Sequence, residues 1–193
     1  GYESNNSYIY NNTVVINKSA DEAFETAIDI KANNTRIFNN IFYAINGSGI
    51  GTQFLNNQDG NINMSHNLFF GNINNGFINQ DVSPQQNSDP NFYNETLENG
   101  AGFQIFANSP AINAGTAYSG VFAQPSINTA NSQIFSSVEA VPSVDFFGYS
   151  IIDDNTPNAG ACNAKNGEFL SVDDAQFQCD VKIKNTVFKN KLF

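Results

Sequence analysis

The sequence has few charged residues, and above all few basic ones. Only 13% of its 193 residues are charged, against roughly 25% in a typical soluble domain, so neutral amides must supply much of the polar surface. Asp and Glu outnumber Lys and Arg by 18 to 8, which gives a net charge of -10. Proteins that bind nucleic acid present a basic surface, and we therefore expect no nucleic-acid partner.

The sequence also lacks any run of 18 or more apolar residues. A helix needs roughly that length to cross the hydrocarbon core of a bilayer, so no membrane span is predicted. The first residues, GYESNNSYIY, do not show the charged-then-apolar pattern of a signal peptide. We expect a mature or trimmed polypeptide rather than an intact precursor.

Cysteines are scarce as well. Cys162 and Cys179 enclose 16 residues, and no third cysteine or nearby histidine completes a zinc set. The leading interpretation is a single disulfide formed in an oxidising compartment, which indicates a secreted or cell-surface protein. The alternative is two free thiols.

One seven-residue phrase is present three times. It reads IYNNTVV at residues 9–15, IFNNIFY at 37–43 and MSHNLFF at 64–70. When the three copies are superposed, one column is always asparagine: Asn12, Asn40 and Asn67. The column before it is always polar: Asn11, Asn39 and His66. The phrases recur every 28 and then 27 residues, and such a period is typical of stacked units that bury their apolar faces against neighbouring copies.

Two kinds of stacked repeat are excluded by what the sequence lacks. Helical repeats need ten-residue amphipathic windows, and leucine-rich repeats need a leucine framework; neither is present. A parallel β-solenoid remains, in which like residues stack about 4.8 Å apart. The three column asparagines are then expected to form a hydrogen-bonded ladder. A second apolar stretch follows each phrase, at residues 27–30, 51–55 and 76–78, and predicts another wall of strands.

The region after the repeat carries motifs of its own. They are DPNF at 89–92, GFQIFANSPAINAG at 102–115, Asp145 with Gly148, and Gly160 with Ala161. With the repeated asparagine pairs, these motifs resemble the C-terminal coils of the right-handed parallel β-helix superfamily, the pectate-lyase-like fold. The pattern is most similar to the tail of the chondroitinase B and alginate lyase group and of secreted bacterial β-helix proteins. The arginine usual after the D-x-x-G element is missing, with Tyr149 and Ser150 in its place, which leaves the pairing of the closing segment open.

The resemblance implies an all-β fold, the C-terminal portion of a right-handed parallel β-helix with an irregular closing segment. Residues 1–117 are expected to form coils and a terminal strand, 118–161 a closing segment packed on the helix, and 162–193 a disulfide-linked extension. The first coil begins at residue 8 without a capping element, and an uncapped solenoid exposes strand edges. We therefore expect N-terminal coils of the same β-helix as a partner, either in a longer precursor or docked as a separate chain.

The lyases of this superfamily imply a polysaccharide substrate and an eliminative reaction. A Lys or Arg takes the proton next to a uronate carboxylate, and Ca²⁺ or another Arg neutralises the acid. The main catalytic residues are expected upstream of this chain, and the candidates within it are Lys31, Arg36 and His66. The alternatives are a solvated Arg36 at the start of a strand, and a His66 that makes one more hydrogen bond in its column.

Two other chemistries have candidate residues. A glycoside hydrolase needs two carboxylates on one surface, and the acidic residues of the predicted loops are Asp21, Glu22, Glu25, Asp29 and Asp59. A Ca²⁺ site would take its oxygen ligands from Asp153, Asp154 and Asn155, or from Asp173 and Asp174. In each case the alternative is a solvated loop or turn.

Two functional hypotheses follow. The first is a secreted, carbohydrate-active β-helix protein of the polysaccharide lyase type, of which this chain supplies the last coils and part of a substrate groove. The second is a non-catalytic extracellular β-helix that binds glycans, adheres to surfaces or acts as a structural spacer.

Overall fold

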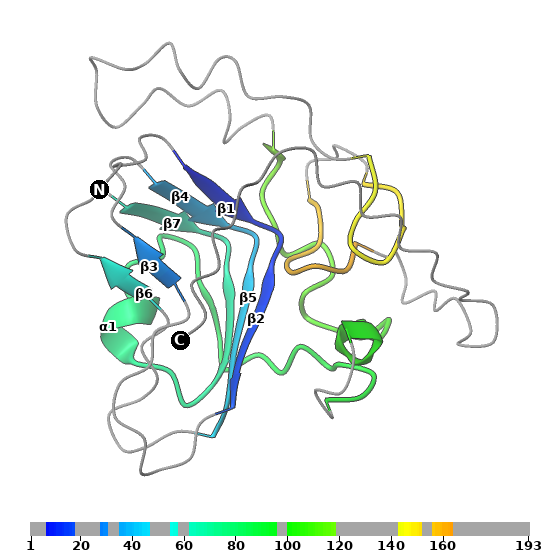
Figure 1. The fold of residues 1–193 in the computed structure, drawn as a ribbon, viewed down its shortest axis with the longest axis horizontal. Helices are drawn as coiled ribbons and strands as arrows, with labels where there is room; N and C mark the ends of the chain where they lie inside the picture. Colours follow the sequence, from blue (N-terminus) through cyan, green and yellow to red (C-terminus); the bar gives the residue numbers. More distant parts are fainter. Residues whose placement is uncertain are drawn as a thin grey trace, which may run out of the picture.

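A computed structural model describes residues 7–17, 28–30, 35–46, 55–57, 62–95, 100–118, 143–151 and 156–163. These residues form an all-β structure of short strands with one four-residue helix and one 3-10 turn (Figure 1). The elements are β1 (Tyr8–Tyr10), β2 (Thr13–Asn17), β3 (Ile28–Ile30), β4 (Thr35–Phe38), β5 (Ile41–Asn46), β6 (Leu55–Asn57), β7 (Ile62–Ser65), β8 (Leu68–Gly71), α1 (Asn75–Ile78), β9 (Gln85–Gln86) and the 3-10 turn (Gly100–Phe103). Within these ranges no helix has the length and apolarity that a bilayer crossing requires.

The strands pair in three parallel sheets, ordered β1-β4-β7, β2-β5-β8-β9 and β3-β6. Their register follows the repeated phrase, because Ile9 lies opposite Ile37, and Ile37 opposite Met64. Each repeat therefore adds one strand to each of the two larger sheets, and we call one such strand–turn–strand unit a layer. The first three layers are β1–β2, β4–β5 and β7–β8, and Figure 1 shows their strands side by side.

The prediction of a further wall of strands is wrong for the third of its three stretches, which is a helix. Residues 28–30 and 55–57 do pair as parallel strands, but the stretch around residues 76–78 forms the helix α1 instead of a strand. The Asn74 side chain accepts a hydrogen bond from the Gly76 N–H at 2.8 Å and caps the helix. The helical turn directs Phe77 into the core, where it is fully buried.

The apolar core lies between the two larger sheets and α1. Phe42 and Phe69 stack with centroids 5.5 Å apart and planes at 15°, and Phe77 meets both rings edge-on at 5.2 and 5.7 Å. Ile37 and Met64 close the core from the neighbouring sheet, each with no exposed surface. Like residues of successive layers therefore pack on one another, as the superposed phrases predict.

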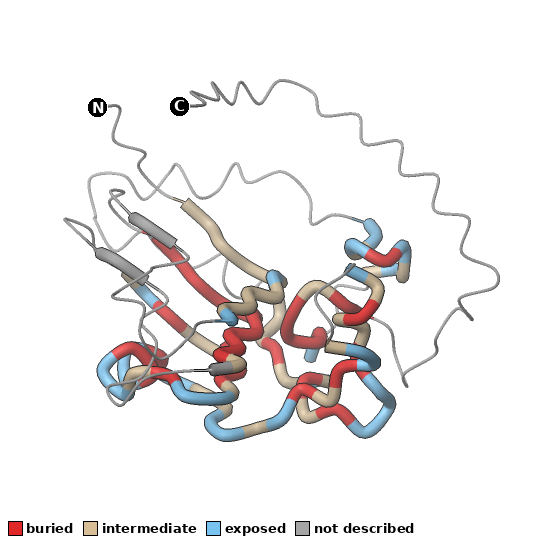
Figure 2. Tube along the Cα trace, turned by 60° about the horizontal axis from the view of Figure 1, so that its bottom comes forward, coloured by how far each residue is buried: buried red, intermediate tan, exposed pale blue. Residues whose placement is uncertain are grey.

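The β2-β5-β8-β9 sheet is covered on its other face by residues 100–118, 143–151 and 156–163. Ile41 and Leu68 pack there against Phe92, Ile105 and Phe147. Figure 1 shows these segments, in green and in yellow to orange, on the side of the sheet away from β3, β6 and α1. The burial colouring in Figure 2 shows buried residues in the central strands and in the segments packed against them. Because both faces are covered, strand β5 is almost entirely buried.

The asparagine column forms a continuous hydrogen-bonded ladder. The backbone N–H and Nδ2 of Asn12 donate to Asn40 Oδ1 at 2.9 and 3.0 Å. The same two groups of Asn40 donate to Asn67 Oδ1, both at 2.9 Å. Asn67 in turn donates to Asp81 Oδ2 at 3.0 and 2.6 Å, so that a carboxylate ends the ladder. Asn40 and Asn67 have no exposed surface, and the ladder satisfies polar groups that would otherwise be buried without partners.

The closing motifs form tight turns against the layers. Asp145 Oδ1 accepts hydrogen bonds from the N–H groups of Phe147 and Tyr149 at 2.8 Å, and Gly148 completes the turn with a φ of 85°. Gly160, with a φ of 86°, donates its N–H to the Asn39 carbonyl at 2.8 Å. Both glycines of the closing motifs thus adopt a left-handed conformation that glycine favours.

The expected disulfide falls partly outside the described part of the chain. Cys162 is buried, with 2% of its surface exposed, and packs with Ile41 and Ala159. Cys179, its expected partner, lies in 164–193, beyond the described residues. The disulfide therefore stays a prediction, as does the proposed division of the chain at residues 117 and 161.

Candidate functional site

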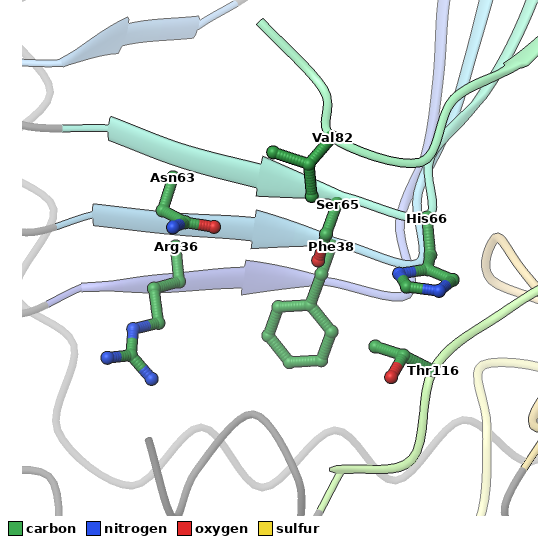
Figure 3. Close-up of a pocket in the computed structure, with 7 residues that line it drawn as sticks. All are labelled: Arg36, Phe38, Asn63, Ser65, His66, Val82 and Thr116. Atoms are coloured by element: carbon green, nitrogen blue, oxygen red, sulfur yellow. The ribbon is translucent and has the colours of Figure 1, made fainter. Parts of the chain in front are cut away.

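A polar pocket of about 180 Å³ opens on the face of the β1-β4-β7 sheet that points away from the core (Figure 3). Strands β4 and β7, the turn after β7, and two more distant segments contribute its wall. The lining residues are Arg36, Phe38, Asn63, Ser65, His66, Val82 and Thr116.

The alternation of side chains along β4 and β7 puts the polar residues in this pocket. Ile37 and Met64 point into the core, so their neighbours along each strand point to the opposite face. Pairing of β4 with β7 sets Arg36 beside Asn63, and Phe38 beside Ser65. The repeat that builds the core therefore also builds one wall of the pocket.

The other wall depends on the polar column that precedes the asparagine ladder. Asn11, Asn39 and His66 occupy equivalent turns with φ values of 53°, 56° and 55°, a left-handed conformation in which Asn and His are enriched. The Asn39 side chain binds the backbone of Thr116 twice, at 2.8 and 2.9 Å. Asn11 Nδ2 donates to the Asn158 carbonyl at 3.3 Å. In the first two layers, the column thus fixes segments that cover the sheets.

The third layer has a histidine at this position, and its environment differs. His66 Nδ1 is buried and has no hydrogen-bond partner among the described residues. Figure 3 shows the imidazole at one end of the pocket, facing Thr116. A buried polar atom without a partner destabilises the folded protein unless water or a ligand satisfies it. His66 therefore has one ring nitrogen without a partner among the described residues, on an imidazole that lines the pocket.

Arg36 is the only positively charged residue of the pocket among its described lining residues. It is 3% exposed, so the interpretation of a solvated residue at a strand start is wrong. Burial lowers the pKa of the Arg36 guanidinium from its ordinary value, and the nearby Tyr8, its neighbour on β1, partly opposes that effect. Arginine keeps its charge at neutral pH, and its planar N–H groups match a carboxylate.

Aromatic rings fix the floor of the pocket. Phe38 stacks on Tyr10 with centroids 5.1 Å apart and planes at 11°, and Tyr118 contacts both rings edge-on at 6.5 and 5.8 Å. Phe38 and Tyr118 are almost fully buried. At the rim, by contrast, Val82 is 73% exposed. The floor is thus made of packed aromatic rings, and the rim offers an apolar contact surface.

The structure brings two of the three predicted catalytic candidates together. Arg36 and His66 line the same pocket, whereas Lys31 lies outside the described residues. Asp29 is in β3, opposite Asn56 of β6. The other predicted hydrolase and calcium candidates also lie outside the described residues: Asp21, Glu22, Glu25, Asp59, Asp153, Asp154, Asn155, Asp173 and Asp174. Where residues are described, no three His, Cys, Asp or Glu side chains gather as metal ligands would.

Sequence reasoning did not identify Asp81 or Thr116. Asp81 follows Asn67 by 14 residues, half the repeat spacing, so no superposition of the phrases aligns it with the ladder. Its Oδ1 accepts the Ser83 N–H at 2.8 Å, and this Asp-x-Ser-Pro turn is the local signal in the sequence. Thr116 enters the pocket through backbone hydrogen bonds to Asn39, 77 residues away, which no local pattern reveals.

A second pocket, of about 260 Å³, is a weaker candidate for a binding site, because the one charged residue among its described lining residues is used in the fold. Tyr10, Asn11 and Asp145 line it with four residues of mainly apolar character, Val144, Phe146, Ile151 and Ala161. Burial raises the pKa of the Asp145 carboxyl, although backbone N–H groups that bind it act in the opposite direction. Both Asp145 oxygens accept hydrogen bonds from backbone N–H groups, those of Phe147, Tyr149 and Asn163. Asp145 is thus a structural residue of the closing turn.

Comparisons with known proteins give no family to which the chain can be assigned. No protein-family model matches it, and no curated protein matches it in sequence.

Proposed function

We propose that the three parallel sheets are walls of a right-handed parallel β-helix, secreted or at the cell surface, whose pocket binds a uronate-containing polysaccharide. Three features support the architecture: the repeat spacing, the strand register and the asparagine ladder. The resemblance of the closing motifs to those of extracellular β-helix proteins supports the location. The ligand class follows from the chemistry of the pocket.

The observation that carries the proposal is that Arg36 and His66 line the same pocket. A uronate presents a carboxylate and several hydroxyl groups on one ring. The Arg36 guanidinium can hold the carboxylate through two parallel N–H···O bonds. His66 Nδ1, which has no partner among the described residues, can form a hydrogen bond with a hydroxyl group. Val82, at the rim, can contact the apolar C–H face of the sugar.

Eliminative cleavage is a second candidate function, because His66 is a base in the same pocket as Arg36. In this reaction neutral His66 takes the proton from the carbon that bears the carboxylate. A C=C bond forms to the neighbouring carbon as the glycosidic C–O bond breaks, and the departing oxygen takes a proton from solvent. Arg36 would stabilise the negative charge that develops on the carboxylate. Simple binding is favoured, because the described lining residues include no carboxyl, lysine or tyrosine as proton donor to the departing oxygen.

His66→Asn provides the most specific test. Asparagine occupies the equivalent turns at positions 11 and 39 with nearly the same φ, so the variant should fold with an unchanged unfolding midpoint. Loss of the imidazole hydrogen bond should weaken binding of alginate, pectate or chondroitin oligosaccharides about tenfold. Isothermal titration calorimetry, with and without added Ca²⁺, measures the dissociation constant.

Arg36→Lys tests the other end of the pocket. Lysine keeps the charge but loses the planar pair of donors, and we expect binding to fall by about ten- to a hundredfold. Asn79→Ala, on the exposed end of α1, is the matched control and should bind as the wild type does. Equal affinity in wild type, His66→Asn and Arg36→Lys would contradict the proposed site. The ultraviolet absorbance of unsaturated uronate products separates cleavage from binding.

A further inference from the structure

Among the described strands, the stack of layers ends at β1 and β2. In the order of described strands, β1 and β2 are the first members of their sheets and pair with one neighbour each. Their residues are half-buried or exposed, whereas those of β4 are all buried. Asn12 is exposed, although Asn40 and Asn67 have no exposed surface. Figure 1 shows β1 and β2 at the outer edge of the two larger sheets.

The ladder has a direction, and this end is its acceptor end. Each ladder asparagine uses its N–H and Nδ2 as donors toward the next layer, and its Oδ1 accepts from the layer before. At the other end, Asp81 Oδ2 receives the two hydrogen bonds from Asn67. Asn12 Oδ1 accepts none from the described residues, while Asn12 Nδ2 donates to Tyr10 and Asn40. In the other layers, each ladder Oδ1 accepts two hydrogen bonds from the asparagine of the layer before. The pattern therefore predicts that Asn12 Oδ1 can accept two hydrogen bonds from a further layer.

We propose that this end binds a partner polypeptide segment that adds one more layer of the same repeat, independently of the ligand in the pocket. The segment would form parallel strands on β1 and β2, and an asparagine in its turn would donate its N–H and Nδ2 to Asn12 Oδ1. This contact repeats the one that already joins the β1–β2 and β4–β5 layers.

The core specifies the apolar residues of the partner segment. Ile9, in β1, and Val14, in β2, are partly buried and pack against the core at this end of the stack. Ile9 stands three residues before Asn12, and Val14 stands two residues after it. The incoming segment should therefore carry an apolar residue three positions before its ladder asparagine and another two positions after it, as all three layers do.

Ladder polarity excludes a second copy of this chain as the occupant. Two copies that met at this end would bring two Asn12 Oδ1 acceptors together without a donor between them. At the other end of a copy, the Asn67 donors are already bound to Asp81. The occupant must therefore be a segment whose ladder asparagine has its donors available.

A labelled peptide that copies residues 35–46, TRIFNNIFYAIN, serves as the probe. It has the required spacing, and we expect fluorescence anisotropy to show that it binds the wild-type chain. The peptide with Asn40→Ala lacks the side-chain donor and should bind about tenfold more weakly. In the protein, Asn12→Ala removes the acceptor, and we expect a similar loss. The Asn12 backbone N–H still reaches Asn40 Oδ1 in this variant, so the fold should persist.

Two results would overturn the proposal. One is binding that neither Asn12→Ala in the protein nor Asn40→Ala in the peptide weakens. The other is self-association of the chain, measured by sedimentation, that Asn12→Ala abolishes, because a second copy would then be the occupant. Asn75→Ala, on the exposed surface of α1, is the control and should leave peptide binding unchanged.

Discussion

Asn40→Asp is expected to reduce the free energy of unfolding at neutral pH by at least about 3 kcal/mol, and the reason is a buried charge without donors. Asn40 has no exposed surface, and its Nδ2 donates to the carbonyls of Ile9 and Phe38 and to Asn67 Oδ1, at 2.9 to 3.0 Å. Aspartate has the same shape but would place a carboxylate oxygen against these three acceptors. Urea unfolding followed by far-ultraviolet circular dichroism measures the loss.

Asn12→Asp is the matched control for this variant. It is the same chemical change in the same column, one layer away, but Asn12 is exposed and water can solvate the new charge. We expect a loss of about 1 kcal/mol or less. A similar loss in both variants would mean that burial of the ladder does not determine its contribution to stability.

Gly71→Ala is expected to be the second strongly destabilising change, with a loss of about 3 to 5 kcal/mol. Gly71 has a φ of 88°, and a Cβ there would lie 2.0 Å from the carbonyl oxygen of Ala44. Ala44 is its partner on the adjacent strand β5. The obstructing atom belongs to the backbone, so no rotation of a side chain can relieve the collision. Thermal unfolding monitored by calorimetry gives the change in stability.

Gly148→Ala is the control that distinguishes the two causes of the loss expected in Gly71→Ala, which are the collision of the Cβ with Ala44 and the strain of a positive φ. Gly148 has a φ of 85°, nearly the same as that of Gly71, but no heavy atom of the described residues contacts its potential Cβ within 4 Å, apart from its neighbours in the chain. This variant should therefore lose only the conformational term, about 1 to 2 kcal/mol. If the two alanine variants proved equally stable, the close approach of β8 to β5 would not be the cause.

The strand register could be predicted because stacked layers require like side chains to meet. The superposed phrases place Ile9, Ile37 and Met64 in one column, and these residues are paired in the structure. The same alignment identified the ladder asparagines. Prediction failed where the repeat stops: the stretch at 76–78 has the apolar content of a wall, but the Asn74 cap makes it helical. Asp81 ends the ladder from a turn that lies outside the superposed phrases.

The candidate site could be predicted in its residues but not in its shape. Arg36 and His66 were identified because they are among the few basic residues of the repeat region. The pairing of β4 with β7 brings the two residues to one face, but the pocket is also bounded by Thr116, which the side chain of Asn39 holds in place. That contact joins two positions far apart in the chain through backbone atoms, and backbone atoms leave no residue-type signal in a sequence.

The carboxylate at the end of the ladder has a consequence for assembly. Solenoids whose two ends complement each other can polymerise head to tail into fibres. Asp81 accepts the last pair of amide hydrogens and has none to pass on. A copy of this chain therefore has no ladder donors to offer to the exposed Asn12 of another copy, so identical chains cannot extend one another through the ladder.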